Sequence, residues 1–350
     1  MKRFVRVVAS FLIFSIAALF PLGTANAQSN ALSITPRKNY NLKAGESVND
    51  TISVINLNKT EDLVIKLTIV DFKAQDESGT PALIKDPNAP TTAWSIKPFT
   101  TLPQQLSIAA GKSTQVPITV KIPSDQGAGS YYSAIQYAVV TGTGKDQVTI
   151  AASSATLVFV NVPGVAREQL KFEQFGAFVP NKGDTNGTFD GIYIAHQPQV
   201  MAYRLTNQGN IAEVPQGAIV IKDMFGKTVK TIEDANPKKQ IVLLGQTRRI
   251  ESCINPQTQK TEGQSGAEVD EVVCKDPGLK PGRYTASLRL LYGSNGNETR
   301  EITAVASFWY LPWWSIIAFV AIVALIVGVV YFLVRKIRDM RDVRGRRGRR

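Results

Sequence analysis

The sequence has one histidine, His196, and only two cysteines, Cys253 and Cys274, among its 350 residues. This scarcity excludes histidine-rich metal centres and most schemes in which histidine acts as the catalytic base, unless His196 is itself that base. The chain also lacks a Walker-type phosphate loop, a Rossmann glycine pattern and an HExxH motif. A structural or solvent-facing role for His196 is therefore favoured. We predict no enzyme activity, no resident metal and no cofactor.

Two weaker chemical readings are kept as alternatives. Asp184, Asn186 and Asp190 resemble part of a calcium loop, but the downstream acidic ligand of an EF-hand is missing. We interpret this segment as an ordinary loop, with weak calcium binding as the alternative. A hydrolase that works with carboxylates alone is a further hypothesis.

The net charge of +12 is concentrated at the two ends of the chain. Three basic residues lie among the first six positions, and nine basic residues with two aspartates lie between position 335 and the end. A basic excess confined to the ends is not the pattern of a nucleic-acid-binding domain, so no nucleic-acid partner is predicted. We interpret residues 335–350 as a cytoplasmic tail that orients the chain and contacts anionic lipid.

Residues 1–27 have the layout of a signal peptide. A basic start is followed by the apolar run Val7–Phe20, and the small residues Ala25 and Ala27 occupy the positions that a signal peptidase requires. The mature chain is expected to begin at Gln28. An uncleaved membrane anchor is the alternative.

Residues 311–334 form a second apolar run, of 24 residues without a charge. As a helix with ~1.5 Å rise per residue it would reach about 36 Å, enough to cross a ~30 Å hydrocarbon core. Tryptophans cluster at its start, and Arg335 and Lys336 follow its end at once. This pattern predicts a single-pass protein of the cell membrane, with residues 28–310 outside and the C-terminus in the cytoplasm.

The segment between these two runs shows the alternation of β-strands. Apolar and polar residues alternate at 63–69, 116–122 and 131–137, and 157–162 is more uniformly apolar. No sustained 3.6-residue period occurs before the apolar run at 311–334. Short alternating runs separated by glycine, proline, asparagine and aspartate predict an all-β sandwich architecture of the immunoglobulin-like class.

Three features recur in the same order and suggest an internal repeat. They are a strand ending in asparagine (Asn56 and Asn207), an apolar strand running into Gly-x-Ser/Thr (Gly111 and Gly245), and a Gly-x-Tyr strand start (Tyr131 and Tyr284). We therefore predict two tandem immunoglobulin-like domains, 28–163 and 164–310. The tyrosine of each Gly-x-Tyr is expected to hydrogen-bond back to the backbone, as in a tyrosine corner.

The second copy is longer than the first by about 19 residues, and both cysteines lie in this insertion. Cys253 and Cys274 bracket 20 residues, and a secreted chain with two cysteines is expected to pair them. Free thiols are the alternative. Two thiols alone make half of a zinc site, which argues against a bound metal.

Trp94 is the one candidate contact for a ligand. Packing of its ring into the core is favoured, and an exposed platform for a sugar ring or a partner is the alternative. Asp71 ends a predicted strand just before the turn at 76–79, and we expect it to anchor that turn rather than to bind a ligand.

The first predicted domain resembles the peptidoglycan-binding domain of bacterial WxL-interacting surface proteins. The resemblance rests on five segments around Trp94 and covers about 130 residues. These are Ile34-Thr35-Pro36, Ser53-Val54-Ile55-Asn56, the turn Asp71 to Gly79, Leu106 to Gly111, and Ile122-Pro123-Ser124-Asp125 to Tyr131.

This resemblance implies a non-enzymatic protein whose first domain contacts peptidoglycan and whose second domain holds a surface protein partner. It carries over no binding residue, and the Cys253–Cys274 insertion departs from the family's pattern. The competing hypothesis is a structural stalk or assembly platform that engages partners by β-strand addition at exposed edges.

Overall fold

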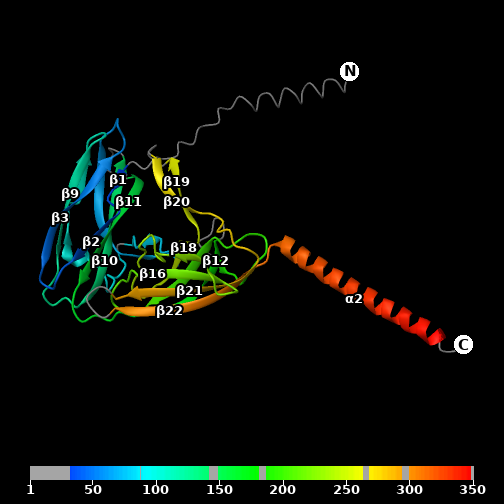
Figure 1. The fold of residues 1–350 in the computed structure, drawn as a ribbon. Helices are drawn as coiled ribbons and strands as arrows, with labels where there is room; N and C mark the ends of the chain where they lie inside the picture. Colours follow the sequence, from blue (N-terminus) through cyan, green and yellow to red (C-terminus); the bar gives the residue numbers. More distant parts are fainter. Residues whose placement is uncertain are drawn as a thin grey trace, which may run out of the picture.

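The computed structural model describes residues 32–347 except for five short internal gaps, at 87, 142–148, 181–186, 263–267 and 294–298. The predicted signal peptide at 1–27 lies outside the described residues. The described chain is mostly β-strand up to Tyr310 and ends in one long helix (Figure 1). The mostly-β class and the apolar C-terminal helix predicted from the sequence are thus confirmed. The division into domains 28–163 and 164–310 stays a prediction.

Two sheets formed by residues 32–162 face each other, and we call them the N-terminal sheet pair. The four-stranded sheet has the order β1 (Leu32–Ile34), β3 (Ser47–Asn56), β9 (Ser113–Lys121) and β7 (Thr100–Thr101). The five-stranded sheet has the order β2 (Arg37–Asn41), β11 (Thr149–Val162), β10 (Gly129–Thr141), β4 (Leu63–Val70) and β8 (Gln105–Ile108). Alternate residues such as Ile65, Val116 and Val158 are fully buried between the sheets, as the period-2 pattern predicts.

Residues 170–310 form a C-terminal sheet pair with the same kind of arrangement. Its four-stranded sheet has the order β13 (Gly187–Phe189), β12 (Leu170–Pro180), β15 (Val200–Asn207) and β18 (Thr247–Cys253). Its five-stranded sheet has the order β14 (Ile192–Tyr193), β22 (Arg300–Tyr310), β21 (Gly282–Tyr292), β16 (Gln216–Asp223) and β17 (Thr228–Ile232). In both pairs a short strand lies parallel to the last long strand, β2 on β11 and β14 on β22.

The recurring sequence features occupy matching places in the two sheet pairs. The side-chain amide of Asn56 donates to the Ile108 carbonyl over 3.1 Å, and that of Asn207 donates to the Val242 carbonyl over 2.9 Å. The hydroxyls of Tyr131 and Tyr284 each donate to the carbonyl four residues earlier, over 2.9 and 2.6 Å. Both tyrosines therefore make the backbone hydrogen bond expected of a tyrosine corner.

Three small elements lie outside the main sheets. They are the short antiparallel pair β5 (Phe72–Ala74) and β6 (Pro81–Leu83), the 3₁₀ turn η1 (Lys97–Phe99), and the two-stranded hairpin β19 (Pro256–Glu262) with β20 (Glu268–Cys274). The hairpin is formed by the predicted insertion of the second copy.

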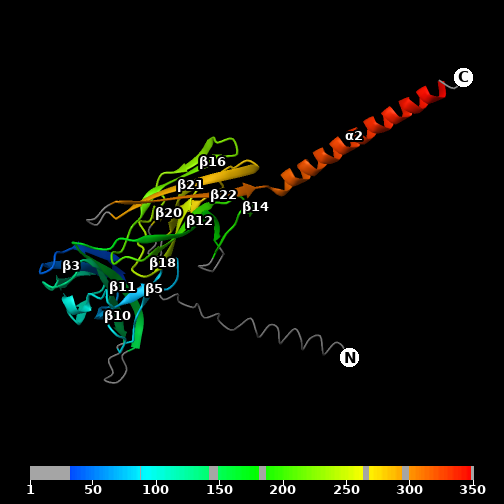
Figure 2. The ribbon, with the colours of Figure 1, turned by 90° about the horizontal axis from the view of Figure 1, so that it is seen from below.

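The C-terminal helix α2 runs over Trp313–Arg347, so it begins two residues later than predicted and continues through most of the predicted tail. Its segment Trp313–Lys336 is long and apolar enough to cross a membrane and is not buried within the protein. Figures 1 and 2 both show α2 leaving one end of the C-terminal sheet pair, with the N-terminal sheet pair at the other end. This arrangement separates the junction of the two sheet pairs from the start of α2.

Candidate functional site

The outer face of the five-stranded N-terminal sheet is apolar where it meets the C-terminal sheet pair. In β11, Val158 and Val160 point into the sandwich, so Leu157 and Phe159 point outward. The outward residues belong to a cluster that joins both sheet pairs, and we call it the junction cluster. Its members are Val70, Phe72, Tyr132, Ala134, Ala212 and Leu243, with Leu83, Trp94, Ala155, Leu157, Phe159, Ile241 and Leu244 packed at its margin.

Trp94 lies at the rim of the junction cluster. Its ring stacks on Tyr132 with centroids 5.7 Å apart, and its carbonyl accepts a hydrogen bond from the Tyr132 amide. The ring is only partly buried, so Trp94 contributes to packing and still presents part of its surface to solvent. A role as a ligand contact stays a prediction.

Asp71 has a different role from the one predicted. Its buried carboxylate accepts hydrogen bonds from the hydroxyls of Ser95 and Ser133, over 2.7 and 2.8 Å, and from the amide and hydroxyl of Thr92. It therefore holds the segment before η1 rather than the turn at 76–79. Burial by itself would raise the pKa of Asp71, but these hydrogen bonds outweigh it and hold the pKa below its ordinary value.

The turn at 76–79 instead fixes the two sheet pairs to each other. The carbonyl of Glu77 accepts from the Arg249 amide over 2.7 Å, and its carboxylate pairs with Arg204 at 2.8 Å. The guanidinium of Arg248 lies directly over Gly79, where any added Cβ would overlap it. Gly79 also has a φ of +75°, so glycine is required here both by backbone conformation and by space.

A second set of contacts closes the junction beside residues 163–169, which connect β11 to β12 and which we call the linker. The Ser130 amide donates to the Asn210 carbonyl, and the Ser130 hydroxyl accepts from the Ala212 amide, both over 2.9 Å. Two carboxylates are buried here, that of Glu168 in the linker and that of Glu213, on which the charge of Glu168 acts. Burial raises the pKa of Glu213 to about 7, and the negative charge of Glu168 raises it further. The Gly293 amide, which donates a hydrogen bond to the Glu213 carboxylate over 3.2 Å, lowers this pKa and so acts against both.

A cavity of about 350 Å³ opens at the junction. Both sheet pairs line it, with Arg37, Asn39 and Phe159 on one side and Ala212 and Ile241 on the other. The wall thus combines apolar side chains with polar ones.

The edge of β11 next to this surface is only half covered. β11 pairs with β10 along most of its length, but with β2 only over Leu157–Asn161. Among the described strands, the edge from Thr149 to Thr156 has no second partner. The Leu157 amide donates to the Pro36 carbonyl on this side, so by alternation the Ala155 amide and carbonyl also face it.

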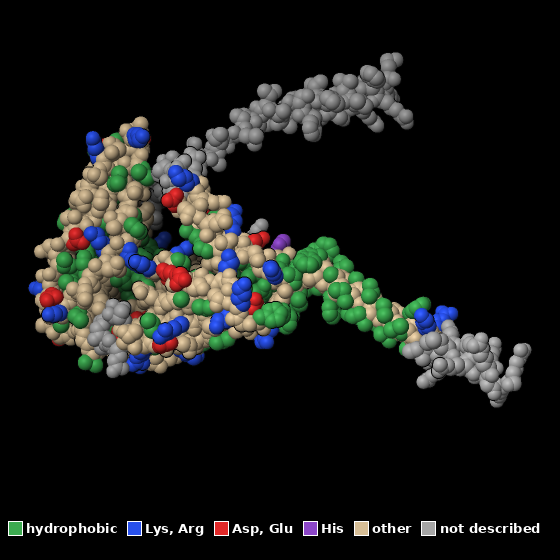
Figure 3. All heavy atoms as spheres, in the orientation of Figure 1, with side chains coloured by type: hydrophobic (Ala, Val, Ile, Leu, Met, Phe, Trp, Pro, Cys, Tyr) green, Lys and Arg blue, Asp and Glu red, His purple; other side chains and the backbone are tan. Residues whose placement is uncertain are grey.

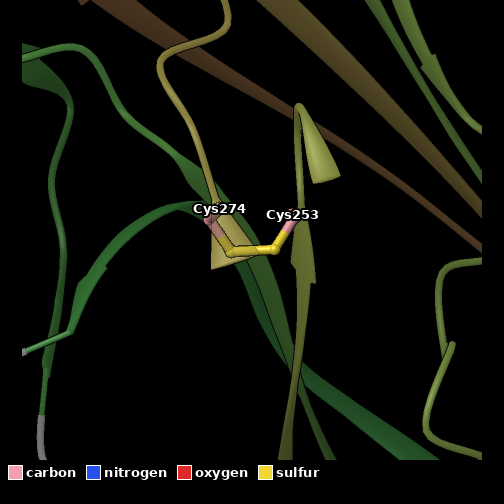
Figure 4. The surroundings of a disulfide bond; sticks show 2 residues. All are labelled: Cys253 and Cys274. Carbon is pink, nitrogen blue, oxygen red and sulfur yellow. A yellow bond between two sulfur atoms is a disulfide. The ribbon is translucent and has the colours of Figure 1, made fainter. Parts of the chain in front are cut away.

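The insertion of the C-terminal sheet pair forms the hairpin β19–β20, whose strands pair only with each other among the described strands. Figure 3 shows the molecule hollowed between the N-terminal sheet pair and the hairpin. The predicted Cys253–Cys274 disulfide is present and joins the end of β18 to the end of β20 (Figure 4). The two strands pair with each other, and the described side chains from Pro256 to Thr261 are exposed. An isolated two-stranded hairpin is marginal in water, so the disulfide supplies much of its order.

Reduction of the Cys253–Cys274 disulfide should lower the free energy of unfolding by roughly 3 kcal/mol in the chain-entropy model for a loop of this size. The measurement is urea unfolding with and without a thiol reductant, with the double variant Cys253→Ser/Cys274→Ser as the control that removes the bond permanently. Equal midpoints under both conditions would show that the hairpin is ordered without the bond.

The remaining predicted residues do not come together into a chemical site. His196 is exposed in the segment after β14. Asp184 and Asn186, from the possible calcium loop, lie outside the described residues. Within the described part of the chain, no group of three or more histidine, cysteine, aspartate or glutamate side chains is placed to hold a metal ion.

Comparisons with known proteins give only distant structural matches. No protein-family model matches it, and no curated protein matches it in sequence. A solved chaperone–tip adhesin complex of CFA/I fimbriae biogenesis is 12% identical, with 78% of this chain and 97% of that chain covered at a TM-score of 0.35. The Salmonella enterica SafA pilin complex with the SafB chaperone is 10% identical, with 79% and 96% covered at a TM-score of 0.34.

A PapD-like domain of human CEP192 is also similar, at 16% identity, covering 39% of this chain and 88% of that domain with a TM-score of 0.27. At these identities and TM-scores the likeness carries no argument about function. The function therefore has to be inferred from the junction of the sheet pairs, the free edge of β11 and the helix α2.

Proposed function

We propose that this chain is a non-enzymatic, membrane-anchored surface protein that holds an extended segment of a protein partner against the free edge of β11. The observation that carries the proposal is the edge from Thr149 to Thr156, which the described strands leave without a second partner and which continues the covered edge over Leu157–Asn161. An extended segment added there would continue the sheet through backbone hydrogen bonds.

The apolar surface beside the edge supplies the second part of the interaction. Ala155, Leu157 and Phe159 are only partly buried on the outer face of β11. A bound segment would place alternate side chains beside this row and the others on the opposite face, which packs on the four-stranded sheet. The segment is expected to be extended, with small or medium apolar residues at every second position.

Anchoring comes from α2. Its Trp313–Lys336 segment has the length and composition of a membrane span, and its exposed apolar side chains have no cover within the described protein. The basic residues that follow the span support a cytoplasmic C-terminus under the positive-inside rule. The two sheet pairs then lie outside, which agrees with the signal peptide expected at 1–27.

The test is made on the full chain in lipid nanodiscs. Peptides that bind it are selected from a displayed random library, and their affinities are compared for the Ala155→Pro and Ala155→Ser variants. Proline removes the edge amide at Ala155 without touching the β10 ladder, so affinity should fall about tenfold or more. Serine keeps the amide and should bind within about twofold of the unchanged chain. Equal affinities for both variants would rule out strand addition at this edge.

Attachment to peptidoglycan is the second function that we propose, on the resemblance to WxL-interacting proteins and on the partly exposed ring of Trp94. Co-sedimentation of the full chain with purified peptidoglycan tests it. Saturable binding that is lost in Trp94→Ala and kept in Ala155→Pro would support this function independently of strand addition. Absence of binding would remove it.

A further inference from the structure

The tight turn between β16 and β17 exposes two large apolar side chains. Phe225 is 88% exposed and Met224 is 54% exposed. The turn is nevertheless well ordered by its own hydrogen bonds, because the Asp223 carboxylate accepts from the amides of Phe225 and Lys227 over 2.9 and 3.0 Å. An ordered turn that presents a phenylalanine to solvent indicates a contact with something outside the described chain.

Strand register places this turn at the end of the molecule from which α2 leaves. Asp223 pairs with Tyr284 on β21, and Gly282, two residues earlier, pairs with Tyr310 at the end of β22. The helix α2 starts three residues after Tyr310. Figures 1 and 2 show this end opposite the N-terminal sheet pair. The Met224–Phe225 turn is therefore beside the point at which the chain would enter a membrane.

Further exposed apolar and basic side chains surround the same end. Ile192 pairs with Trp309, and both are substantially exposed. The exposed basic residues here are Lys227, Lys280 and Arg283. Acidic groups at this end include Asp223, which is engaged in the turn, and the exposed Asp190 and Asp276, the latter directly before Pro277. Figure 3 shows hydrophobic and basic side chains next to each other where α2 begins.

We propose that the Met224–Phe225 turn inserts into the headgroup region of the membrane that α2 spans, with Lys227, Lys280 and Arg283 contacting anionic lipid. Apolar tips surrounded by basic side chains are typical of surfaces that bind at the lipid interface. The contact is continuous with the span itself, because Trp309 and the start of α2 belong to the same end.

The consequence is a fixed orientation of the protein on the membrane. A span alone allows the sheets to swing about the residues between β22 and α2, whereas a second contact at Phe225 prevents this. β21 runs over Gly282–Tyr292, eleven residues. At ~3.3 Å per residue it keeps the junction about 35 Å from the lipid surface. The inference rests on the proposed membrane anchoring by α2, but not on strand addition.

The test uses the full chain, with its disulfide intact, in vesicles of phosphatidylcholine with phosphatidylserine as a minor component. Phe225→Cys is labelled with an environment-sensitive fluorophore, and quenching by lipid carrying a nitroxide is measured. Val165→Cys is the matched control, because Val165 is fully exposed and lies between the two sheet pairs. Leu325→Cys, within α2, reports the span itself.

Quenching at position 225 should be about threefold or more above that at 165, in line with burial at the lipid interface. Equal quenching at 225 and 165, with strong quenching at 325, would overturn insertion of the turn while leaving the anchor intact. Weak quenching at 325 would overturn the anchor and the insertion together. Energy transfer between labels at 225 on different molecules, without lipid quenching, would assign the turn to a second copy and overturn the proposal.

The role of the basic residues has its own readout. The variant Lys280→Glu/Arg283→Glu should reduce quenching at 225 in vesicles that contain phosphatidylserine and leave it unchanged in phosphatidylcholine alone. Quenching that is unaffected by this variant in both kinds of vesicle would overturn the assignment of anionic lipid as the ligand.

Discussion

Replacement of Glu213 by glutamine is expected to stabilise the protein by about 2–3 kcal/mol above pH 7 and to change its stability little below pH 4.5. Burial raises the pKa of Glu213 to about 7, with the nearby charge of Glu168 adding to the rise, while Gly293 and Arg300 act against it. Between its unfolded pKa and about 7, the folded protein holds a proton that the unfolded chain has lost. Stability therefore falls as the pH rises through this window, and the Glu213→Gln variant avoids that loss.

The measurement is urea unfolding of the full chain in detergent from pH 4 to pH 8, for the unchanged protein and the Glu213→Gln variant. The matched control is Glu301→Gln, because Glu301 is an exposed carboxylate on β22 that pairs with Arg289. It should show no gain in stability above pH 7. A Glu213→Gln variant whose stability follows the same pH profile as the unchanged protein would contradict the assignment.

The variant Tyr132→Ala is expected to lower the free energy of unfolding by about 3–5 kcal/mol, the range for removing a large aromatic from a core. Tyr132 is fully buried and its ring centroid lies 5.1 Å from Phe72, 5.6 Å from Phe159 and 5.7 Å from Trp94. Because this cluster joins the two sheet pairs, the variant should also loosen their relative placement. Small-angle scattering should then give a larger radius of gyration.

Tyr132→Phe keeps the ring and is the matched control for this experiment. Its unfolding midpoint and radius of gyration should stay close to those of the unchanged protein, since a volume-conserving change disturbs packing little. If Tyr132→Ala lost stability but kept the same radius of gyration, the junction would depend on the turn at 76–79 rather than on the aromatic cluster.

Local pattern accounts for most of the strands that the structure contains. The alternating run predicted at 63–69 lies within β4, and that at 131–137 lies within β10. The Gly-x-Tyr starts and the asparagine strand ends could be recognised in the sequence because each recurs in both copies. The hydrogen bonds of the two tyrosines also span only four residues each. The Cys253–Cys274 pairing was predictable from the count of cysteines together with the signal peptide expected at 1–27.

The junction was beyond the reach of local pattern, because its partners are distant in the sequence. The carboxylate of Asp71 bonds to Ser95 and Ser133, which are 24 and 62 residues away. Glu77 meets Arg204 across 127 positions of chain, so the sequence led to the prediction that Asp71 anchors the turn at 76–79 and did not show that this turn joins the two sheet pairs. The free edge of β11 is likewise a property of the whole sheet, since it depends on where β2 ends.

The proposed binding of an extended segment at β11 is tested most directly by amide hydrogen exchange at single-residue resolution, with and without a selected peptide. Added backbone pairing predicts slower exchange at Ser153 and Ala155, whose amides face the free edge. No change is predicted at Ser154, whose amide faces β10. Slower exchange only around Trp94 and the loops of the junction, with no change along β11, would contradict strand addition and place the partner elsewhere.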